Sequence, residues 1–181
     1  TRARSDDKSI IQGSNFRITV ITERVVRLEF SSSGQFIDRP TQLVSKRDLG
    51  LADFSVKQDT HYLQIATKYF NLTYLKRAPF IGSKIDPAKN LKISLISRDR
   101  DRNKDWYYGH PEARNLLGNM ISVDLNCENN LAHGLYSLDG FASIDDSKSK
   151  IIMEDGTLAD PPADHIDIYV FMYDRDFRQA L

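Results

Sequence analysis

Apolar and polar residues alternate along most of the chain, and this period of two is typical of β-strands. In Asn15–Thr22, for example, Phe16, Ile18 and Val20 fall on one face, while polar residues fall on the other. The alternation predicts about ten short strands. They cover residues 15–22, 24–30, 53–57, 61–67, 68–75, 91–95, 120–125, 140–144, 150–153 and 166–173.

The last predicted strand, residues 166–173, is apolar on both faces. Ile168 and Val170 lie on one face, and Tyr169 and Phe171 lie on the other. A strand that is buried on both sides has this pattern, so we expect it inside a sheet and not at an edge.

Short strands at a spacing of roughly 8–15 residues, without a long helical period, are typical of an antiparallel sandwich. We therefore predict a mainly β protein, an antiparallel β-sandwich over residues 15–173, preceded by an N-terminal tail at residues 1–14. A chain of 181 residues is long enough for one domain of this kind.

Two segments depart from the strand pattern. Residues 99–119 form a long polar stretch with aromatic residues in it, and we predict a loop there. Residues 174–181 resemble the start of a helix, with Asp174 as the N-cap and Asp176 in the first turn.

Composition excludes several classes of protein. Lys and Arg number 25, as do Asp and Glu, so the net charge of zero does not favour a nucleic-acid binder. No apolar run approaches the ~18 residues that a membrane span needs. The single cysteine, Cys127, cannot form a disulfide within the chain. We therefore expect a reducing, cytoplasmic setting.

The chain shows no motif for a metal or a cofactor, and we predict neither. The acidic run Asp99–Asp105 resembles the start of a calcium loop, but Lys104 and His110 occupy the positions that need Gly and Glu. The four histidines have no zinc-type spacing.

Residues 145–147, Asp-Asp-Ser, form the most compact carboxylate pair of the sequence. Neighbouring side chains on a strand point to opposite faces, so Asp145 and Asp146 are not able to flank one glycosidic bond. We expect them to make turn hydrogen bonds to the backbone instead.

Several ordered segments resemble family 31 glycoside hydrolases, the α-glucosidase and α-xylosidase group. Asn115-Leu-Leu-Gly-Asn-Met-Ile-Ser-Val-Asp124 is similar to their Asn-Leu-Gly-Gly-Thr-x-Arg-x-Leu-Asp. Gly134–Ser147 is similar to Gly-Leu-Leu-Ser-Arg-x-Gly-Trp-x-x-x-Asp-Asp-Ser, and Asp167–Leu181 to Asp-x-Tyr-x-Phe-x-Tyr-Gly-x-Asp-Tyr-x-x-Ala-Leu. Phe16–Phe30 fits their opening strands, so the resemblance covers nearly the whole chain.

The resemblance implies a galactose-mutarotase-like β-sandwich, the non-catalytic N-terminal domain of a retaining enzyme that hydrolyses terminal α-linked glucose or xylose. It implies that residues 174–181 begin a linker helix to a catalytic (β/α)8 barrel, which would follow Leu181 and carry both catalytic aspartates. The expected partners are an α-linked glycoside, the enzyme's own barrel and, in an oligomer, further copies of the enzyme. We expect this chain alone to be inactive.

In the family, a loop of this domain reaches the mouth of the barrel, and residues 99–119 are the corresponding candidate. Its aromatic side chains can stack on a sugar, and its polar side chains can form hydrogen bonds. The alternative is that the aromatics hold the loop on the sandwich. The candidates are Trp106, Tyr107, Tyr108, Arg114, Asn115 and Asn119.

Two other functions are consistent with the sequence. A free-standing carbohydrate-binding β-sandwich would need no catalytic residues. A sugar epimerase of the mutarotase type would need a general acid and base on one sheet face, for which His133 and His165 are available without a supporting motif.

Overall fold

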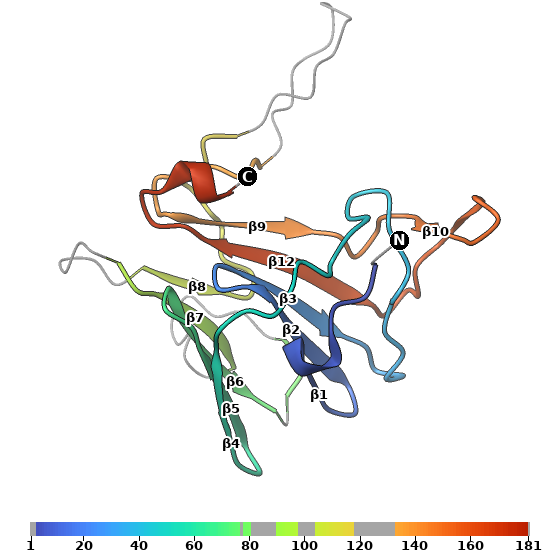
Figure 1. The fold of residues 1–181 in the computed structure, drawn as a ribbon, viewed down its shortest axis with the longest axis horizontal. Helices are drawn as coiled ribbons and strands as arrows, with labels where there is room; N and C mark the ends of the chain where they lie inside the picture. Colours follow the sequence, from blue (N-terminus) through green and yellow to red (C-terminus); the bar gives the residue numbers. More distant parts are fainter. Residues whose placement is uncertain (1–2, 77, 81–89, 98–103, 118–132, 181) are drawn as a thin grey trace, which may run out of the picture.

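The computed structural model describes residues 3–76, 78–80, 90–97, 104–117 and 133–180, and in this part of the chain the strands form two five-stranded sheets and one two-stranded pair. The predicted strand at 120–125 lies outside the described residues. Every strand pairing in the two large sheets is antiparallel. Figure 1 shows the two sheets as separate layers, one coloured mainly blue and red and the other green to yellow.

The first sheet joins the two ends of the chain. Its order is β1-β2-β3-β12-β9. The strands are β1 (Ile10–Gln12), β2 (Phe16–Thr22), β3 (Val25–Phe30), β12 (Ile166–Met172) and β9 (Phe141–Asp145).

The second sheet is built from consecutive strands in the order β4-β5-β6-β7-β8. They are β4 (Ser55–Gln58), β5 (Tyr62–Ala66), β6 (Phe70–Leu75), β7 (Leu91–Leu95) and β8 (Asp105–Tyr107). The smaller elements are β10 (Ile151–Ile152), β11 (Leu158–Ala159), and the 3-10 helices η1 (Asp7–Ser9) and η3 (Phe177–Ala180).

One hydrophobic core joins the inner faces of the two sheets, as a sandwich requires. Side chains of the first sheet, such as Ile18, Leu28 and Val170, belong to the same buried cluster as Leu72 and Ile93 of the second sheet. Alternation along each strand places these side chains inward and their neighbours outward. The predicted β-sandwich class is therefore supported by the arrangement of the sheets.

Most predicted strands are present with small shifts at their ends, and β12 lies inside its sheet as predicted, between β3 and β9. The prediction of a loop throughout residues 99–119 is wrong at β8, where Trp106 enters the core. β8 has only three residues, and a segment of that length is too short to show a period of two.

Residues before Asn15 also take part in the sandwich. We expected a tail at 1–14, but β1 pairs with β2 and extends the first sheet at its edge. The side chain of Ser5 donates to the carbonyl oxygen of Arg47 at 2.7 Å, which ties the first residues to the chain segment around Arg47.

Asp174 does not cap a helix, contrary to prediction. It has a φ of 56°, and its carboxylate accepts from Lys104 Nζ at 2.6 Å and from Ser97 Oγ at 2.9 Å. The carboxylate is therefore engaged by the second sheet, and the short 3-10 helix η3 begins three residues later, at Phe177. No α-helix occurs in the described ranges.

The outer face of the first sheet carries a layer of buried ion pairs. Arg27 on β3 donates to Asp167 on β12 through Nε at 2.8 Å and Nη2 at 2.6 Å. Arg17 on β2 donates to Glu29 through Nε at 2.6 Å and Nη2 at 2.9 Å. All four side chains are at most 4% exposed. Each guanidinium thus meets a carboxylate in the two-pronged geometry that stabilises buried charge.

The chain segment at residues 36–48, which we call the strap, covers this layer. The carbonyl oxygen of Ile37 accepts from both Arg17 and Arg27. Further along, Arg47 is 1% exposed and donates through Nε to the hydroxyl of Tyr169 at 2.5 Å. Its Nη1 donates to the carbonyl oxygens of Ala3 and Arg39 at 3.1 and 2.7 Å. The strap therefore excludes water from the ion pairs.

Charge pairing sets the pKa of the buried groups. Burial raises the pKa of Asp167, but attraction by the Arg27 guanidinium outweighs burial and holds that pKa well below its usual range. Burial likewise opposes the charge of Arg27, yet Asp167 and Glu29 raise its pKa above the ordinary value. Both groups are therefore charged at neutral pH.

Removing one partner of the central pair should destabilise the fold strongly. Asp167→Asn leaves the Arg27 guanidinium buried with less negative charge beside it, so we expect the free energy of unfolding in urea to fall by about 3–5 kcal/mol. Asp160→Asn is the matched control, because the pair between Lys150 and Asp160 is exposed; its loss should stay under about 1 kcal/mol. Equal losses in the two variants would contradict a structural role for the buried layer.

The same carboxylate should make stability depend on acid. Because the pKa of Asp167 is lower in the folded than in the unfolded chain, its contribution is complete above the unfolded value of about 4 and is lost as pH falls further. We expect urea unfolding at pH 6, 4 and 3 to show a steeper loss below about pH 4 in the wild type than in Asp167→Asn. Parallel curves for the two proteins would rule this linkage out.

Candidate functional site at one end of the sandwich

Two segments separated in the sequence pair with each other where β9 begins. Asn115 and Ser137 form an isolated antiparallel bridge. On either side of it, the amide of Leu116 donates to the carbonyl oxygen of Tyr136 at 2.7 Å, and the amide of Leu138 donates to that of Arg114 at 3.0 Å. Residues 114–116 and 136–138 are thereby held side by side.

The side chain of Asn115 completes this junction from inside. It is 9% exposed, and its oxygen accepts from the amides of Leu117 and Gly134 at 2.8 and 3.0 Å. Its Nδ2 donates to the carbonyl oxygen of Gly134 at 2.8 Å and to Glu112 at 3.2 Å. One buried amide therefore makes hydrogen bonds to four backbone or side-chain groups.

A third segment, the end of β12, reaches the same place. The Tyr173 hydroxyl accepts from the amide of Ser137 at 2.6 Å. Burial raises the pKa of Tyr173 to about 12, so the phenol stays protonated at neutral pH. The amides of Tyr173 and Asp174 both donate to the carbonyl oxygen of Gly140. Gly140 has a φ of 79°, and a Cβ there would lie 2.6 Å from the Asp174 carbonyl oxygen, so glycine is required.

Glu112 is the buried carboxylate of this site. It is 2% exposed, has a φ of 45°, and accepts a hydrogen bond from the Ser143 hydroxyl on β9. Its amide donates to His110 Nδ1 at 3.0 Å, which assigns the remaining imidazole proton to Nε2. Burial lowers the pKa of His110, and the neutral ring packs edge-on against Phe141.

The chemistry available at this site is binding and positioning. The Glu112 oxygens accept from Ser143 and Asn115, so both already have a donor. Glu112 therefore links the side chain of Ser143 on β9 to that of Asn115 in the junction.

Among the described residues, Glu29, His165 and Asp167 are the group whose ligand atoms come close enough to hold a metal ion. Both carboxylates, however, already accept from Arg17 or Arg27. A cation placed there would face two buried guanidinium groups, so these residues do not fit a metal.

The structure separates the predicted site residues. Trp106 is 1% exposed and belongs to the core, which fits the alternative that the aromatics hold their segment on the sandwich. Tyr107 and Tyr108 are half-buried, Arg114 is exposed and pairs with Asp139 at 3.2 Å, and Asn115 lies inside the junction. Asn119 lies outside the described residues.

Apolar side chains surround the junction on the surface, and we call them the apolar rim. Tyr136 contacts Phe177 of η3, with ring centroids 5.9 Å apart. The exposed members are Leu116, Leu117, Leu138 and Phe177. Exposed apolar groups gathered in this way are typical of a surface that contacts a partner.

The prediction of turn hydrogen bonds to the backbone holds for Asp145 and is wrong for Asp146, whose carboxylate is buried and bonds to a distant side chain. Asp145 accepts from the Ser147 amide at 2.9 Å, a turn hydrogen bond, while Asp146 points inward and accepts from Thr41 at 2.8 Å. Glu112 was not among the sequence candidates, since no motif marks it. Tyr173 had a signal, because a tyrosine at the end of a buried strand needs a partner for its hydroxyl.

No protein-family model and no curated protein matches this chain. No helix in the described part of the chain has the length and apolar character to cross a bilayer.

Asn115 gives a direct test of the junction. Asn115→Ala removes the acceptor of the Gly134 and Leu117 amides, so we expect faster hydrogen exchange at both and a loss of about 1–3 kcal/mol in the free energy of unfolding. Arg114→Ala is the control, because that side chain is exposed and pairs only at the surface; it should leave both exchange rates unchanged. Wild-type exchange in Asn115→Ala would show that the side chain does not hold the junction.

Proposed function

We propose that this chain is the non-catalytic N-terminal domain of a retaining α-glycosidase of the kind that family 31 represents. It would pack against a catalytic barrel and help to shape the pocket for a terminal α-linked glucose or xylose. The catalytic carboxylates would come from the barrel, about 5–5.5 Å apart as retention requires.

The observation that carries the proposal is the junction itself. The segments that resemble the family, at residues 115–124, 134–147 and 167–181, are far apart in the sequence. Their described parts converge through the Asn115 amide and the Tyr173 hydroxyl. Chance similarities scattered along a chain would have no reason to meet at one end of the fold.

The fold is consistent with the proposal at a coarser level. Two five-stranded antiparallel sheets with a common core agree with a sandwich, and the galactose-mutarotase-like type is the finer assignment that we propose. The apolar rim around Leu116 and Phe177 supplies a surface for the barrel.

Within this proposal, residues 107–117 act at the mouth of the barrel. Arg114 is the most accessible polar candidate, and Tyr107 and Tyr108 offer partly exposed rings. Trp106 would act indirectly, because its buried ring holds β8 in the second sheet. The strained backbone at Glu112 and Leu117, with φ of 45° and 64°, fits a loop whose shape matters for function.

A free-standing carbohydrate-binding domain is the second candidate. A hollow beside β4 and β5 is lined by Lys57, Gln58, Asp59 and Gln64 together with Tyr62, which is 46% exposed. An exposed ring among amide and carboxylate groups is a common way to bind a sugar. This hollow lies on the second sheet, on strands apart from the junction.

Kinetics of a protein that carries this chain together with a barrel would test the proposal. We expect hydrolysis of p-nitrophenyl α-glucoside or α-xyloside, and a KM raised about fivefold in Arg114→Ala with kcat nearly unchanged, because a contact made equally in ground and transition states is lost. Arg39→Ala is the control, since Arg39 pairs with Glu154 away from the junction.

The 181 residues alone should not hydrolyse either substrate. Saturable release of p-nitrophenol by this chain would overturn the non-catalytic assignment. Sugar binding by the chain that Tyr62→Ala abolishes, without hydrolysis by the longer protein, would favour the carbohydrate-binding alternative.

A further inference from the structure

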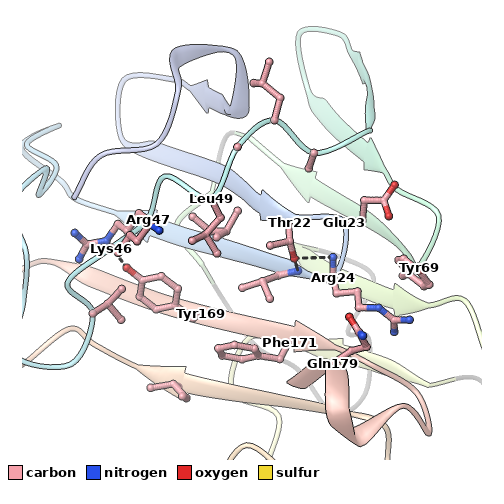
Figure 2. Close-up of a pocket in the computed structure, with 17 residues that line it drawn as sticks. Thr22, Glu23, Arg24, Lys46, Arg47, Leu49, Tyr69, Tyr169, Phe171 and Gln179 are labelled. Carbon is pink, nitrogen blue, oxygen red and sulfur yellow. Dashed lines mark hydrogen bonds between the residues drawn. The ribbon is translucent and has the colours of Figure 1, made fainter. Parts of the chain in front are cut away.

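A pocket of about 500 Å³ lies on the outer face of the first sheet, apart from the junction. Figure 2 shows it between the strands and the chain segment at residues 44–52, which continues the strap. This volume is in the range of sites that enclose a small ligand.

The floor of the pocket is apolar and comes from four strands. Ile21 at the end of β2, Val25 on β3, Ile144 on β9 and Phe171 on β12 contribute to it. Phe171 stands opposite Val25 on one side and Ala142 on the other in the strand register. These are outward-facing positions of the sheet, so their apolar character is not needed for the core of the sandwich.

The wall of the pocket is a segment that does not pack down on that floor. Arg47 anchors the strap to the Tyr169 hydroxyl at the edge of the pocket. Beyond this anchor, Leu49 and Leu51 line the pocket while remaining 55% and 58% exposed. Gly50 between them has a φ of 94°, a backbone conformation that glycine adopts without strain. Apolar floor and apolar wall thus face a shared space.

The charges that line the pocket are mainly positive. Arg24, Lys46 and Arg47 line it, against a single carboxylate from Glu23. Arg24 stacks on Tyr69 at 3.7 Å and donates to the Tyr173 carbonyl oxygen. Arg47 already donates hydrogen bonds to the Tyr169 hydroxyl and to two backbone carbonyl oxygens. Lys46 has no hydrogen bond or ion pair within the described ranges. Figure 2 shows Lys46 and Arg24 toward opposite ends of the pocket.

We propose that this pocket binds a linear aliphatic carboxylate, with its chain between Phe171 and Leu49 and its carboxylate paired with Lys46. Apolar surface on both sides favours an alkyl chain over a sugar, whose hydroxyl groups would be left without partners. The positive rim favours an anion over a neutral or cationic amphiphile. This assignment goes beyond the proposed domain role and does not depend on it.

Calorimetric titration with octanoate, decanoate and decanol, below their micelle concentrations or solubility limits, tests the assignment. We expect one saturable site per chain. Decanoate should bind about tenfold more tightly than octanoate, because it has two more methylene groups and burial of each raises the affinity about fourfold at most. Decanol should bind about threefold more weakly than decanoate, because it lacks the charge that pairs with Lys46 and an exposed ion pair contributes about that much to affinity. Lys46→Gln should remove that difference.

Variants of the exposed wall separate ligand binding from folding. Leu49→Asp and Leu51→Asp should each weaken decanoate binding at least tenfold while leaving the circular dichroism spectrum unchanged. Leu43→Asp is the matched control, because Leu43 is 49% exposed on the same segment and does not line the pocket; its affinity should match the wild type.

Three results would overturn the proposal. One is the absence of saturable decanoate binding by the folded chain. Another is equal weakening by Leu43→Asp and Leu49→Asp, which would indicate non-specific adsorption. The third is a dimer in sedimentation experiments that Leu49→Asp dissociates, which would assign the apolar wall to contact with a second copy.

Discussion

The pairing of Arg27 with Asp167 is the interaction on which the architecture depends. Arg27 and Asp167 are 140 positions apart in the sequence, and their pairing joins β3 to β12. It thereby holds β12 in a sheet whose first strands come from the N-terminal part of the chain. Asp167 lies opposite Glu29 in the register, and Tyr169 lies opposite Arg27. A slip of one residue would turn the Asp167 carboxylate into the apolar core. The buried charges therefore disfavour any register in which the two faces of β12 are exchanged.

Both surfaces that we assign to function follow from that register. Inward and outward positions on β12 are set together, and the strand is followed directly by Tyr173, whose hydroxyl accepts from the Ser137 amide at the junction. The outward position of Phe171 places its ring in the floor of the pocket. A rigid sheet thus supports two sites of different character, a hydrogen-bonded junction with an apolar rim and an apolar pocket with a positive edge.

Alternation along the chain was sufficient to predict most strands, since inward side chains repeat at every second position. It failed at β8, which has only three residues with Trp106 at its centre. The helix N-cap expected at Asp174 failed for another reason, because that carboxylate pairs with Lys104, which directly precedes β8. The candidate site was predicted in part. Asn115 stood in a motif and Arg114 lay directly before it, but the role of Glu112 depends on Ser143, which approaches only when β9 is in place.

The sequence by itself determined the class of fold, the internal place of β12 and the residues that face the core, because these follow from the local period of the side chains. It left open what covers the outer face of the first sheet. Arg17, Arg27, Glu29 and Asp167 occupy outward positions that a local pattern assigns to solvent. Only the tertiary structure buries them, because the strap that excludes water comes from another part of the chain and is held there by Arg47. Burial of charge is therefore a non-local property, since it depends on which distant segment replaces the solvent.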